Sequence, residues 1–210
     1  MNFWTPLITS AVLLVIYHGL DFYLQFRYHR NTVSFSSLLI TPQYVLALLV
    51  GIGEYLLEWL LIPGFKSSSF ASLCYVLGLT VAVVGDTFRK LGMVHNNVGF
   101  THLIARQRRP EHTLVTDGVY SLCRHPGYAG WFWWCLGVAL MQCNPFTLVA
   151  YAVVSWRFFY SRIQTEEYYL VSWFQSDYTK YRSAVPSLIP FLDRALGISH
   201  RADGKRRKVD

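Results

Sequence analysis

The most constraining feature of the sequence is a set of long apolar segments, each bounded by charged or helix-terminating residues. Three of them cover residues 7–26, 38–62 and 70–91. At about 1.5 Å per residue, each segment is long enough as a helix to cross the roughly 30 Å hydrocarbon core of a bilayer. The chain is 53% hydrophobic and 15% charged, and its apolar residues come in blocks, unlike the scattered pattern of a soluble core. The sequence therefore predicts an all-α integral membrane protein.

Two further apolar segments predict a helical hairpin. The first covers residues 127–143, which is short for a full crossing, and the second begins at Pro145 and continues past Glu167. Pro145 suits the first turn of a helix, where its missing N–H is not needed. Because the connection at Asn144 and Pro145 is tight, the two segments must be antiparallel neighbours. We therefore expect about five transmembrane helices, of which the last two form this hairpin.

The distribution of basic residues predicts the orientation in the membrane. With five crossings, the connections after the first, third and fifth segments lie on one side, and of the 19 Lys and Arg residues only Lys66 falls on the other. Such an asymmetry marks the cytoplasmic side. We expect a cytoplasmic C-terminus and a retained first segment, because no signal-peptide pattern precedes it. The net charge of +7 is then better explained by an anionic membrane surface than by nucleic acid.

The same features predict three regions. Residues 1–91 form a three-span membrane scaffold, and residues 92–195 form a catalytic region. That region contains a polar cytoplasmic loop, the helical hairpin 127–167 and a C-terminal cap. Residues 196–210 form a basic tail that we expect to be disordered and close to lipid.

The acidic residues inside the apolar segments are interpreted as having a structural role. Glu54 and Glu58 lie one turn apart, and with Asp86 they suggest polar contacts inside the bundle or pairing with Arg89. No metal site is predicted, because the histidines are irregularly spaced and form no helical H-x-x-x-H pattern. The cysteines show no C-x-x-C spacing and are interpreted as small packing residues: Cys74, Cys123, Cys135 and Cys143.

Arg162 and Glu166 are the first candidates for function. They lie one turn apart, where the helix that begins at Pro145 leaves the bilayer. A surface ion pair of this spacing contributes only about 0.2–0.5 kcal/mol. Charge at this depth is costly unless it is partnered or functional. We interpret the two residues as functional, with a simple surface pair as the alternative.

Arg124, His125 and Pro126 open the first helix of the hairpin. Taken alone, Arg124 is best interpreted as an interfacial residue whose charged end reaches water, with Pro126 starting the helix. The functional interpretation concerns His125, which stands at a helix entrance. There, free backbone N–H groups and the positive end of the helix dipole favour an anion such as a carboxylate.

Together these residues resemble those of a known family, the isoprenylcysteine carboxyl methyltransferases. The similarity runs almost without gaps from Phe100 to Phe191, and it is weaker but visible upstream, in residues 54–63 and 85–90. The stretches that carry it are His112-Thr-Leu-Val-Thr-Asp-Gly-Val-Tyr120, Arg124-His-Pro-Gly-Tyr-Ala-Gly-Trp-Phe132, Asn144-Pro145, Trp156-Arg-Phe-Phe159, Arg162, Glu166-Glu167, Tyr178, Tyr181, Val185-Pro186 and Ile189-Pro190-Phe191.

The resemblance implies a multi-pass enzyme of the endoplasmic-reticulum membrane with a cytoplasmic active site. Such an enzyme transfers a methyl group from S-adenosylmethionine to the carboxylate of a prenylated C-terminal cysteine on CaaX-processed proteins, such as small GTPases. Arg162 and Glu166 are then the expected catalytic residues, and Arg162 recognises the substrate carboxylate. The implied cofactor contacts are His112, Thr113, Leu114, Val115, Tyr120, His125, Pro126, Gly127, Tyr128 and Glu166.

Two positions depart from the family pattern. A glutamine that contacts the cofactor in the family falls on Ala105 without gaps, and Gln107 takes its place only if the alignment shifts. Gly127 stands where serine is common, which matters little if the contact is made through the backbone.

The expected chemistry agrees with the residue types. A C-terminal carboxyl group has a pKa of about 3.3–3.7, so near neutrality it is already a nucleophile and no general base is required. Trp131 and Trp156 are expected to line a side opening for the prenyl chain, with an interfacial belt as the alternative for each. The competing functions are a membrane methyltransferase acting on a phospholipid amine or other lipid, and a non-catalytic membrane scaffold.

Overall fold

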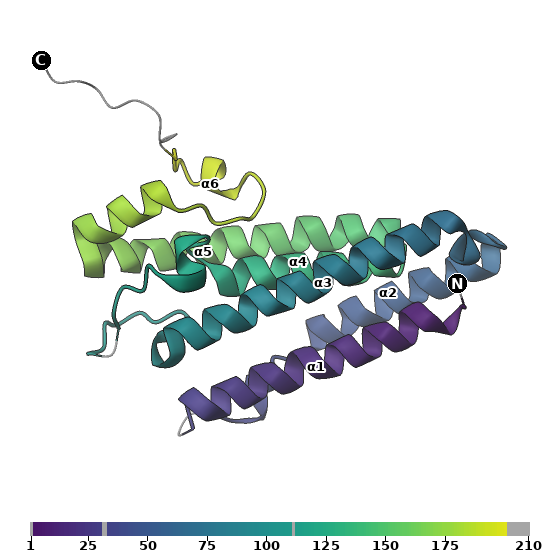
Figure 1. The fold of residues 1–210 in the computed structure, drawn as a ribbon, viewed down its shortest axis with the longest axis horizontal. Helices are drawn as coiled ribbons and strands as arrows, with labels where there is room; N and C mark the ends of the chain where they lie inside the picture. The colour runs from purple at the N-terminus through teal and green to yellow at the C-terminus, as the bar shows by residue number, and fades with distance from the viewer. Residues whose placement is uncertain (1, 31–32, 111, 201–210) are drawn as a thin grey trace, which may run out of the picture.

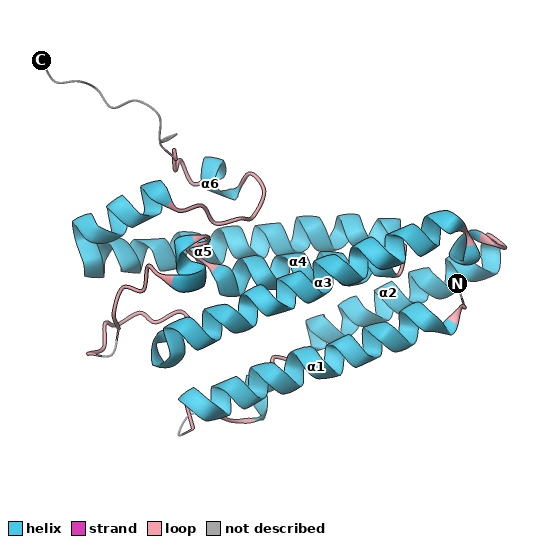
Figure 2. Cartoon of the chain, in the orientation of Figure 1, coloured by secondary structure: helices cyan, strands magenta, loops and turns pink. Residues whose placement is uncertain are grey.

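The computed structural model describes residues 2–30, 33–110 and 112–200, and Figure 2 shows only helices and loops within these ranges. The α-helices are α1 (Trp4–Tyr28), α2 (Pro42–Leu61), α3 (Ser69–Asn96), α4 (Pro126–Met141), α5 (Pro145–Ala184) and α6 (Leu192–Ala195). Short 3₁₀ turns occur at η1 (Phe35–Leu38), η2 (Phe65–Ser67), η3 (Asn97–Gly99) and η4 (Gly118–Ser121). The prediction of an all-α fold is confirmed for the described residues, and the basic run 205–208 lies outside them.

The five long helices run alternately in opposite directions. The N-terminus and the α2–α3 and α4–α5 connections lie at one end of the bundle (Figure 1). The α1–α2 connection, the loop between α3 and α4, and the C-terminal part of α5 lie toward the other end. The hairpin expected around Pro145 is thus formed by α4 and α5.

Local sequence signals explain where α2 and α3 begin. Thr41 caps α2 by accepting a hydrogen bond from Tyr44 N at 3.2 Å, and a proline follows it in the first turn. Ser68 caps α3 in the same way, accepting from Ala71 N at 3.1 Å. The predicted end of the third segment at residue 91 is wrong, because α3 continues to Asn96. Met93 is buried, and this burial stabilises the last turn of α3. The sequence alone predicted that a polar loop begins at this point.

Large apolar side chains cover the outside of the first three helices. Within the described residues, α1, α2 and the helical stretch from Ser69 to Gly99 are long and apolar enough to cross a membrane. Val15 is 70% exposed and Leu61 is 72% exposed, although neither side chain gains anything from contact with water. So much exposed apolar surface on helices of this length indicates an integral membrane protein.

Helix α4 lies at the centre of the bundle and packs backbone to backbone against α3. A Cβ atom added to Gly85 would lie 2.8 Å from Gly130 O, and one added to Gly130 would lie 2.5 Å from Gly85 O. The same close approach recurs one heptad away, at Gly78 and Gly137. Because no side chain fits at these distances, glycine is required for the two helices to approach this closely.

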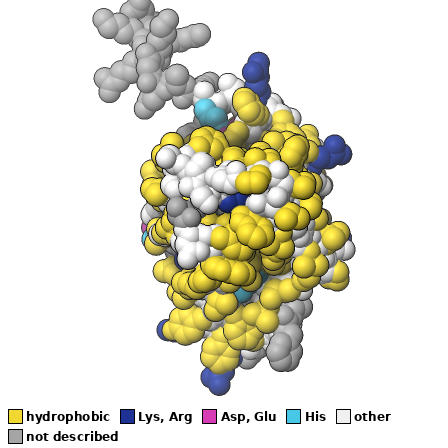
Figure 3. Space-filling model, turned by 90° about the vertical axis from the view of Figure 1, so that its right-hand side faces the viewer, with side chains coloured by type: hydrophobic (Ala, Val, Ile, Leu, Met, Phe, Trp, Pro, Cys, Tyr) yellow, Lys and Arg dark blue, Asp and Glu magenta, His cyan; other side chains and the backbone are white. Residues whose placement is uncertain are grey.

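A buried lysine organises the end of the bundle that carries the α4–α5 turn. Lys66 is 2% exposed, and its Nζ lies 2.5 Å from Glu58 Oε2. It also donates hydrogen bonds to the carbonyls of Gln142 and Cys143 and to Asn144 Oδ1. Figure 3 views this end of the molecule, and hydrophobic side chains cover most of the surface around it.

The acidic residues of the apolar segments make polar contacts inside the bundle. Glu54 accepts hydrogen bonds from the backbone N–H groups of Phe146 and Thr147 and so caps the start of α5. Asp86 pairs with Lys90, at 2.5 Å, and not with Arg89. The structural interpretation of these acids is confirmed, but the acidic partner of Arg89 is a residue of α1, Asp21.

Helix α5 is interrupted at Gln175, where φ is 48° and ψ is −119°. After this break the helical chain folds back over the end of the bundle, as the yellow-green segment in Figure 1 shows. The segment that follows ends in α6, which lies against the loop before α4. This arrangement closes one side of the region where the candidate residues meet.

Candidate active site

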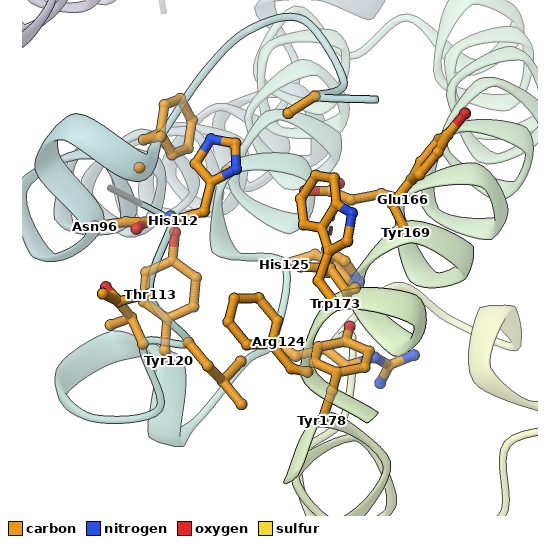
Figure 4. A pocket seen from close by; sticks show the side chains of 18 of the residues that line it. Asn96, His112, Thr113, Tyr120, Arg124, His125, Glu166, Tyr169, Trp173 and Tyr178 are labelled. Carbon is orange, nitrogen blue, oxygen red and sulfur yellow. Dashed lines mark ion pairs between the residues drawn. The ribbon is translucent and has the colours of Figure 1, made fainter. Parts of the chain in front are cut away.

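The residues expected to contact a cofactor line one cavity of about 120 Å³ at the start of α4. They are His112, Thr113, Leu114, Val115, Tyr120, His125, Pro126, Gly127, Tyr128 and Glu166. We call this space the polar cavity, because imidazole, hydroxyl and carboxylate groups gather around it. Figure 4 shows His112 and Thr113 entering from the loop, His125 from the start of α4, and Glu166 and Trp173 from α5.

Aromatic stacking joins the loop to α5 across the polar cavity. The ring of His112 stacks on Trp173, with centroids 5.3 Å apart and planes inclined by 26°. At the other side, Tyr120 donates a hydrogen bond to Gly92 O at 3.3 Å, and its own carbonyl accepts one from Tyr181 Oη at 2.6 Å. The loop is therefore held against both α3 and α5.

Two adjacent glutamates on α5 have different surroundings. Glu167 is 5% exposed, and its Oε1 atom accepts hydrogen bonds from His125 Nε2 at 2.9 Å and Tyr178 Oη at 3.0 Å. Glu166 lines the polar cavity, and its Oε2 atom is buried without a hydrogen-bond partner. The Nδ1 atom of His125 lies 3.7 Å from this oxygen. The carboxylate of Glu166 therefore has hydrogen-bonding capacity left for a ligand, whereas that of Glu167 is engaged within the protein.

Arg124 holds the C-terminal cap and does not reach water. Its side chain is fully buried, with Nε 2.7 Å from Glu167 Oε1 and Nη2 2.5 Å from Asp193 Oδ1. Its Nη1 donates to Val185 O at 3.0 Å. The interpretation of Arg124 as an interfacial residue reaching water is therefore wrong, because three elements supply acceptors for it. Burial raises the pKa of Asp193, but the hydrogen bonds from Arg124, Ser187 N and His200, together with the charge of Arg124, lower it to about 2.

A second, larger cavity of about 410 Å³ lies between α1 and α2 on one side and α4 and α5 on the other. We call it the apolar cavity, because aliphatic and aromatic side chains dominate its lining; examples are Leu48, Trp134, Val138, Val154 and Phe158. Trp131 is among the residues that line it. Trp156 lies elsewhere, donating to Pro190 O at 2.8 Å and stacking on Tyr160, so it takes no part in this cavity.

The two cavities share a wall formed by Phe100, Thr101 and Tyr128. Arg162 lies on the apolar side of this wall, with Nε donating to Tyr128 Oη at 3.1 Å. Glu166 lies on the polar side, although it is only one turn further along α5. Among the described residues, no ion pair joins Arg162 to Glu166. The surface-pair alternative therefore does not describe them, and each faces a different cavity.

Of the two positions considered for the family glutamine, only one lies beside the polar cavity. Ala105 lines the polar cavity, whereas Gln107 does not. The histidines of this region are divided between the cavities, with His102 in the apolar one and His112 and His125 in the polar one. In the described part of the chain, no three His, Cys, Asp or Glu residues come together in a way that suits a metal ion.

Several residues at the site were not recognised from sequence. Asn96, Tyr169 and Trp173 line the polar cavity, and Glu167 holds His125. The spacing of Tyr169 and Trp173 after Glu166 puts all three near one face of a helix, which is a usable signal. The sequence gives no comparable signal for Asn96, because the end of α3 was predicted several residues too early.

Known proteins of one family match this chain. The profile of the "Isoprenylcysteine carboxyl methyltransferase (ICMT) family" matches residues 76–172. A "Probable protein-S-isoprenylcysteine O-methyltransferase" from Oryza sativa subsp. indica is 43% identical over 184 residues, covering 87% of this chain and 95% of the relative. "Protein-S-isoprenylcysteine O-methyltransferase B" from Arabidopsis thaliana is 40% identical over 181 residues, covering 86% of this chain and 90% of the relative.

The fold also matches a solved structure. It is described as the eukaryotic intramembrane Ras methyltransferase ICMT, and it is 31% identical in sequence with a TM-score of 0.84. The match covers 91% of this chain and 68% of that one. Most residues that line the polar cavity lie within the stretch 76–172 that the family profile matches. On sequence and on structure, the chain belongs to the isoprenylcysteine carboxyl methyltransferase family.

Proposed function

We propose that the chain is a protein-S-isoprenylcysteine O-methyltransferase, which methylates the carboxylate of a prenylated C-terminal cysteine. The observation that carries this proposal is the junction of two cavities of opposite character at Phe100, Thr101 and Tyr128. A polar donor and a substrate with a long apolar chain need two such compartments that meet at the reacting atoms. The names of the relatives agree with this assignment.

The polar cavity suits S-adenosylmethionine as methyl donor. The unpartnered Oε2 of Glu166 is an acceptor for a polar group of the donor, and His125 and Gly127 stand at the start of α4, where an anionic group is favoured. His112 and Trp173 close the outer side. S-adenosylmethionine, when bound, supplies an activated methyl group on a positively charged sulfur, and S-adenosylhomocysteine is left as the product.

The apolar cavity suits the prenylcysteine. Transfer of the prenyl chain from water into a bilayer is favourable by roughly 0.8 kcal/mol per buried CH₂, so the substrate arrives from the membrane. Trp131 lines the cavity that would receive this chain. Arg162 positions the carboxylate at the shared wall. Because this carboxylate is already ionised near neutrality, no residue has to remove a proton, and the role of the protein is to align the reactants.

We further propose that α4 and the first half of α5 cross the membrane with α1, α2 and α3, giving about five spans in the endoplasmic-reticulum membrane. Residues 1–91 then serve as the scaffold, 92–195 as the catalytic region and 196–210 as a basic tail. The polar cavity and the C-terminus face the cytoplasm, on the side that carries all Lys and Arg residues except Lys66. CaaX-processed proteins of the small GTPase type, which reach that membrane face, are the proposed substrates.

The direct test is to incubate the purified protein in lipid with labelled S-adenosylmethionine and N-acetyl-farnesylcysteine. We expect a base-labile methyl ester. Base-stable label on a lipid amine would assign the chain to phospholipid methylation instead. A protein that transfers no label and whose Tm does not rise with S-adenosylhomocysteine would be a scaffold without catalysis.

The residue assignments are tested by Arg162→Ala and Glu166→Ala. The first is expected to raise the KM for the prenylcysteine and to leave S-adenosylhomocysteine affinity unchanged. The second is expected to weaken S-adenosylhomocysteine binding. Arg157→Ala is the matched control, because Arg157 lies on the same helix but lines neither cavity. Wild-type kinetics and affinities in both test variants would contradict the assignment.

A further inference from the structure

His102 lies beside Arg162, and the proposed mechanism leaves it without a role. His102 lines the apolar cavity, and Arg89 Nη2 lies 3.2 Å from the Nδ1 atom of its ring. Its backbone carbonyl accepts a hydrogen bond from Arg162 Nη2. Its other ring nitrogen, Nε2, is buried and has no hydrogen-bond partner. His102 is thus tied to both arginines of this region but retains one unused polar atom.

The contact with Arg89 determines which nitrogen of His102 carries the proton. A guanidinium group only donates hydrogen bonds, so Nδ1 must accept and the proton of the neutral ring lies on Nε2. Arg89 is itself fixed, because its Nη2 and Nε atoms lie 2.7 and 3.0 Å from Asp21 Oδ2. Burial and the charge of Arg89 lower the pKa of His102 to about 3, so the ring stays neutral near pH 7.

A buried N–H group without an acceptor is costly, and proteins rarely retain one unless a ligand or water satisfies it. The acceptor that suits this position is an anion, because Arg162 is the neighbouring residue and also lines the cavity. Arg162 already uses Nε on Tyr128 Oη and Nη2 on the His102 carbonyl. A carboxylate held by Arg162 alone would be fixed by its remaining N–H groups only.

We propose that the Nε2–H group of His102 donates a hydrogen bond to the carboxylate of the prenylcysteine substrate. His102 and Arg162 then hold the carboxylate from two different elements, the loop after α3 and helix α5. Because the imidazole is neutral, it orients the anion without adding a second full positive charge that would weaken the nucleophile. This inference rests on the proposed function and adds a substrate-binding residue to it.

The test uses N-acetyl-farnesylcysteine and a matched ligand without the carboxylate, N-acetyl-S-farnesylcysteamine, measured as an inhibitor. His102→Phe keeps an aromatic ring but removes the donor, and we expect it to raise the KM for the acid about 10- to 100-fold. The inhibition constant of the cysteamine and the affinity for S-adenosylhomocysteine are expected to stay close to wild type. His102→Gln, which restores an N–H group near the position of Nε2, should recover part of the lost affinity for the acid.

His18→Phe is the matched control. His18 also lines the apolar cavity and has an unpartnered Nδ1 atom, but its Nε2 atom is bonded to Tyr44 Oη at 3.0 Å, on the α2 side. Any effect of this variant should change the affinities for the acid and the cysteamine by the same factor. A Tm that rises with S-adenosylhomocysteine checks folding of each variant, and His102→Leu replaces His102→Phe if that variant fails the check.

The outcomes separate the inference from the proposed function. Wild-type protein that forms no ester overturns the proposed function, and the role of His102 with it. Wild-type protein that forms the ester, combined with an unchanged KM in His102→Phe, overturns only the role of His102. Equal losses of affinity for the acid and the cysteamine also overturn it, because they indicate a structural role for the ring.

Discussion

Replacing Glu167 by alanine is expected to destabilise the fold strongly, although Glu167 lines neither cavity. Its Oε1 atom accepts hydrogen bonds from Arg124 Nε at 2.7 Å, His125 Nε2 at 2.9 Å and Tyr178 Oη at 3.0 Å. These donors come from the loop before α4, the start of α4 and the part of α5 beyond its break. One carboxylate therefore joins the elements that shape the polar cavity.

The magnitude follows from what the alanine variant leaves behind. The Arg124 side chain is 0% exposed, so its guanidinium stays buried after the carboxylate is removed. Removing one partner of a buried ion pair costs about 3–5 kcal/mol. Arg124 keeps Asp193 Oδ1 at 2.5 Å, which places the expected loss at about 3 kcal/mol. Glu167→Gln keeps one acceptor oxygen but loses the charge, and a loss of about 1 kcal/mol is expected.

The free energy of unfolding can be followed by tryptophan fluorescence during denaturant titration in mixed micelles. Glu166→Ala is the matched control, since Glu166 is the adjacent residue and its Oε2 atom has no hydrogen-bond partner. It is expected to unfold within about 0.5 kcal/mol of wild type but to lose the stabilisation by S-adenosylhomocysteine. Equal stability of the Glu167→Ala and Glu166→Ala variants would refute the reasoning.

Three further perturbations test other parts of the fold. Gly130→Ala is expected to destabilise it by about 1–3 kcal/mol in the same titration, because the added methyl would meet a carbonyl oxygen of α3 at 2.5 Å. Lys66→Met is expected to cost about 3–5 kcal/mol by leaving Glu58 buried without its cation, and adding Glu58→Gln should recover part of this loss. The pKa of Asp193 is lowered to about 2 from 3.8, so its stabilising contribution is complete above about pH 4 and is lost as the pH falls through about 2. Hydrogen-exchange protection factors of α6 should therefore be constant from about pH 7 to 5 and fall on further acidification; constant protection down to about pH 2 would contradict this.

The helices were predictable where composition and local signals agree. Bilayer-length apolar segments gave α1 and α2, and Asn144-Pro145 gave the turn between α4 and α5. The end of α3 was not predictable, because Gly92 and the residues after it look like a loop. They are helical because Gly92 packs against Pro126, where an added Cβ would lie 2.9 Å from the Pro126 ring. Tertiary packing therefore overrides the local signal at this position.

The residues predicted to contact a cofactor could be found from sequence because all of them except Glu166 lie in two short motifs, 112–120 and 124–132. Their partners could not, since the bonds from Arg124 to Glu167 and Asp193 join positions far apart in the chain. The break at Gln175 has no signal either, because neither glycine nor proline marks it. The glycine contacts between α3 and α4 were readable in principle, since Gly78, Gly85 and Gly92 recur at intervals of seven.

The direct contact between the backbones of α3 and α4 closes one route by which a lipid could enter. Where Gly85 and Gly130 meet, no acyl or prenyl chain can pass between the two helices. The face of α4 that carries Trp131 and Trp134 lines the apolar cavity instead. A membrane-dissolved substrate therefore cannot reach the apolar cavity by passing between α3 and α4, and its methylated product cannot leave by that route.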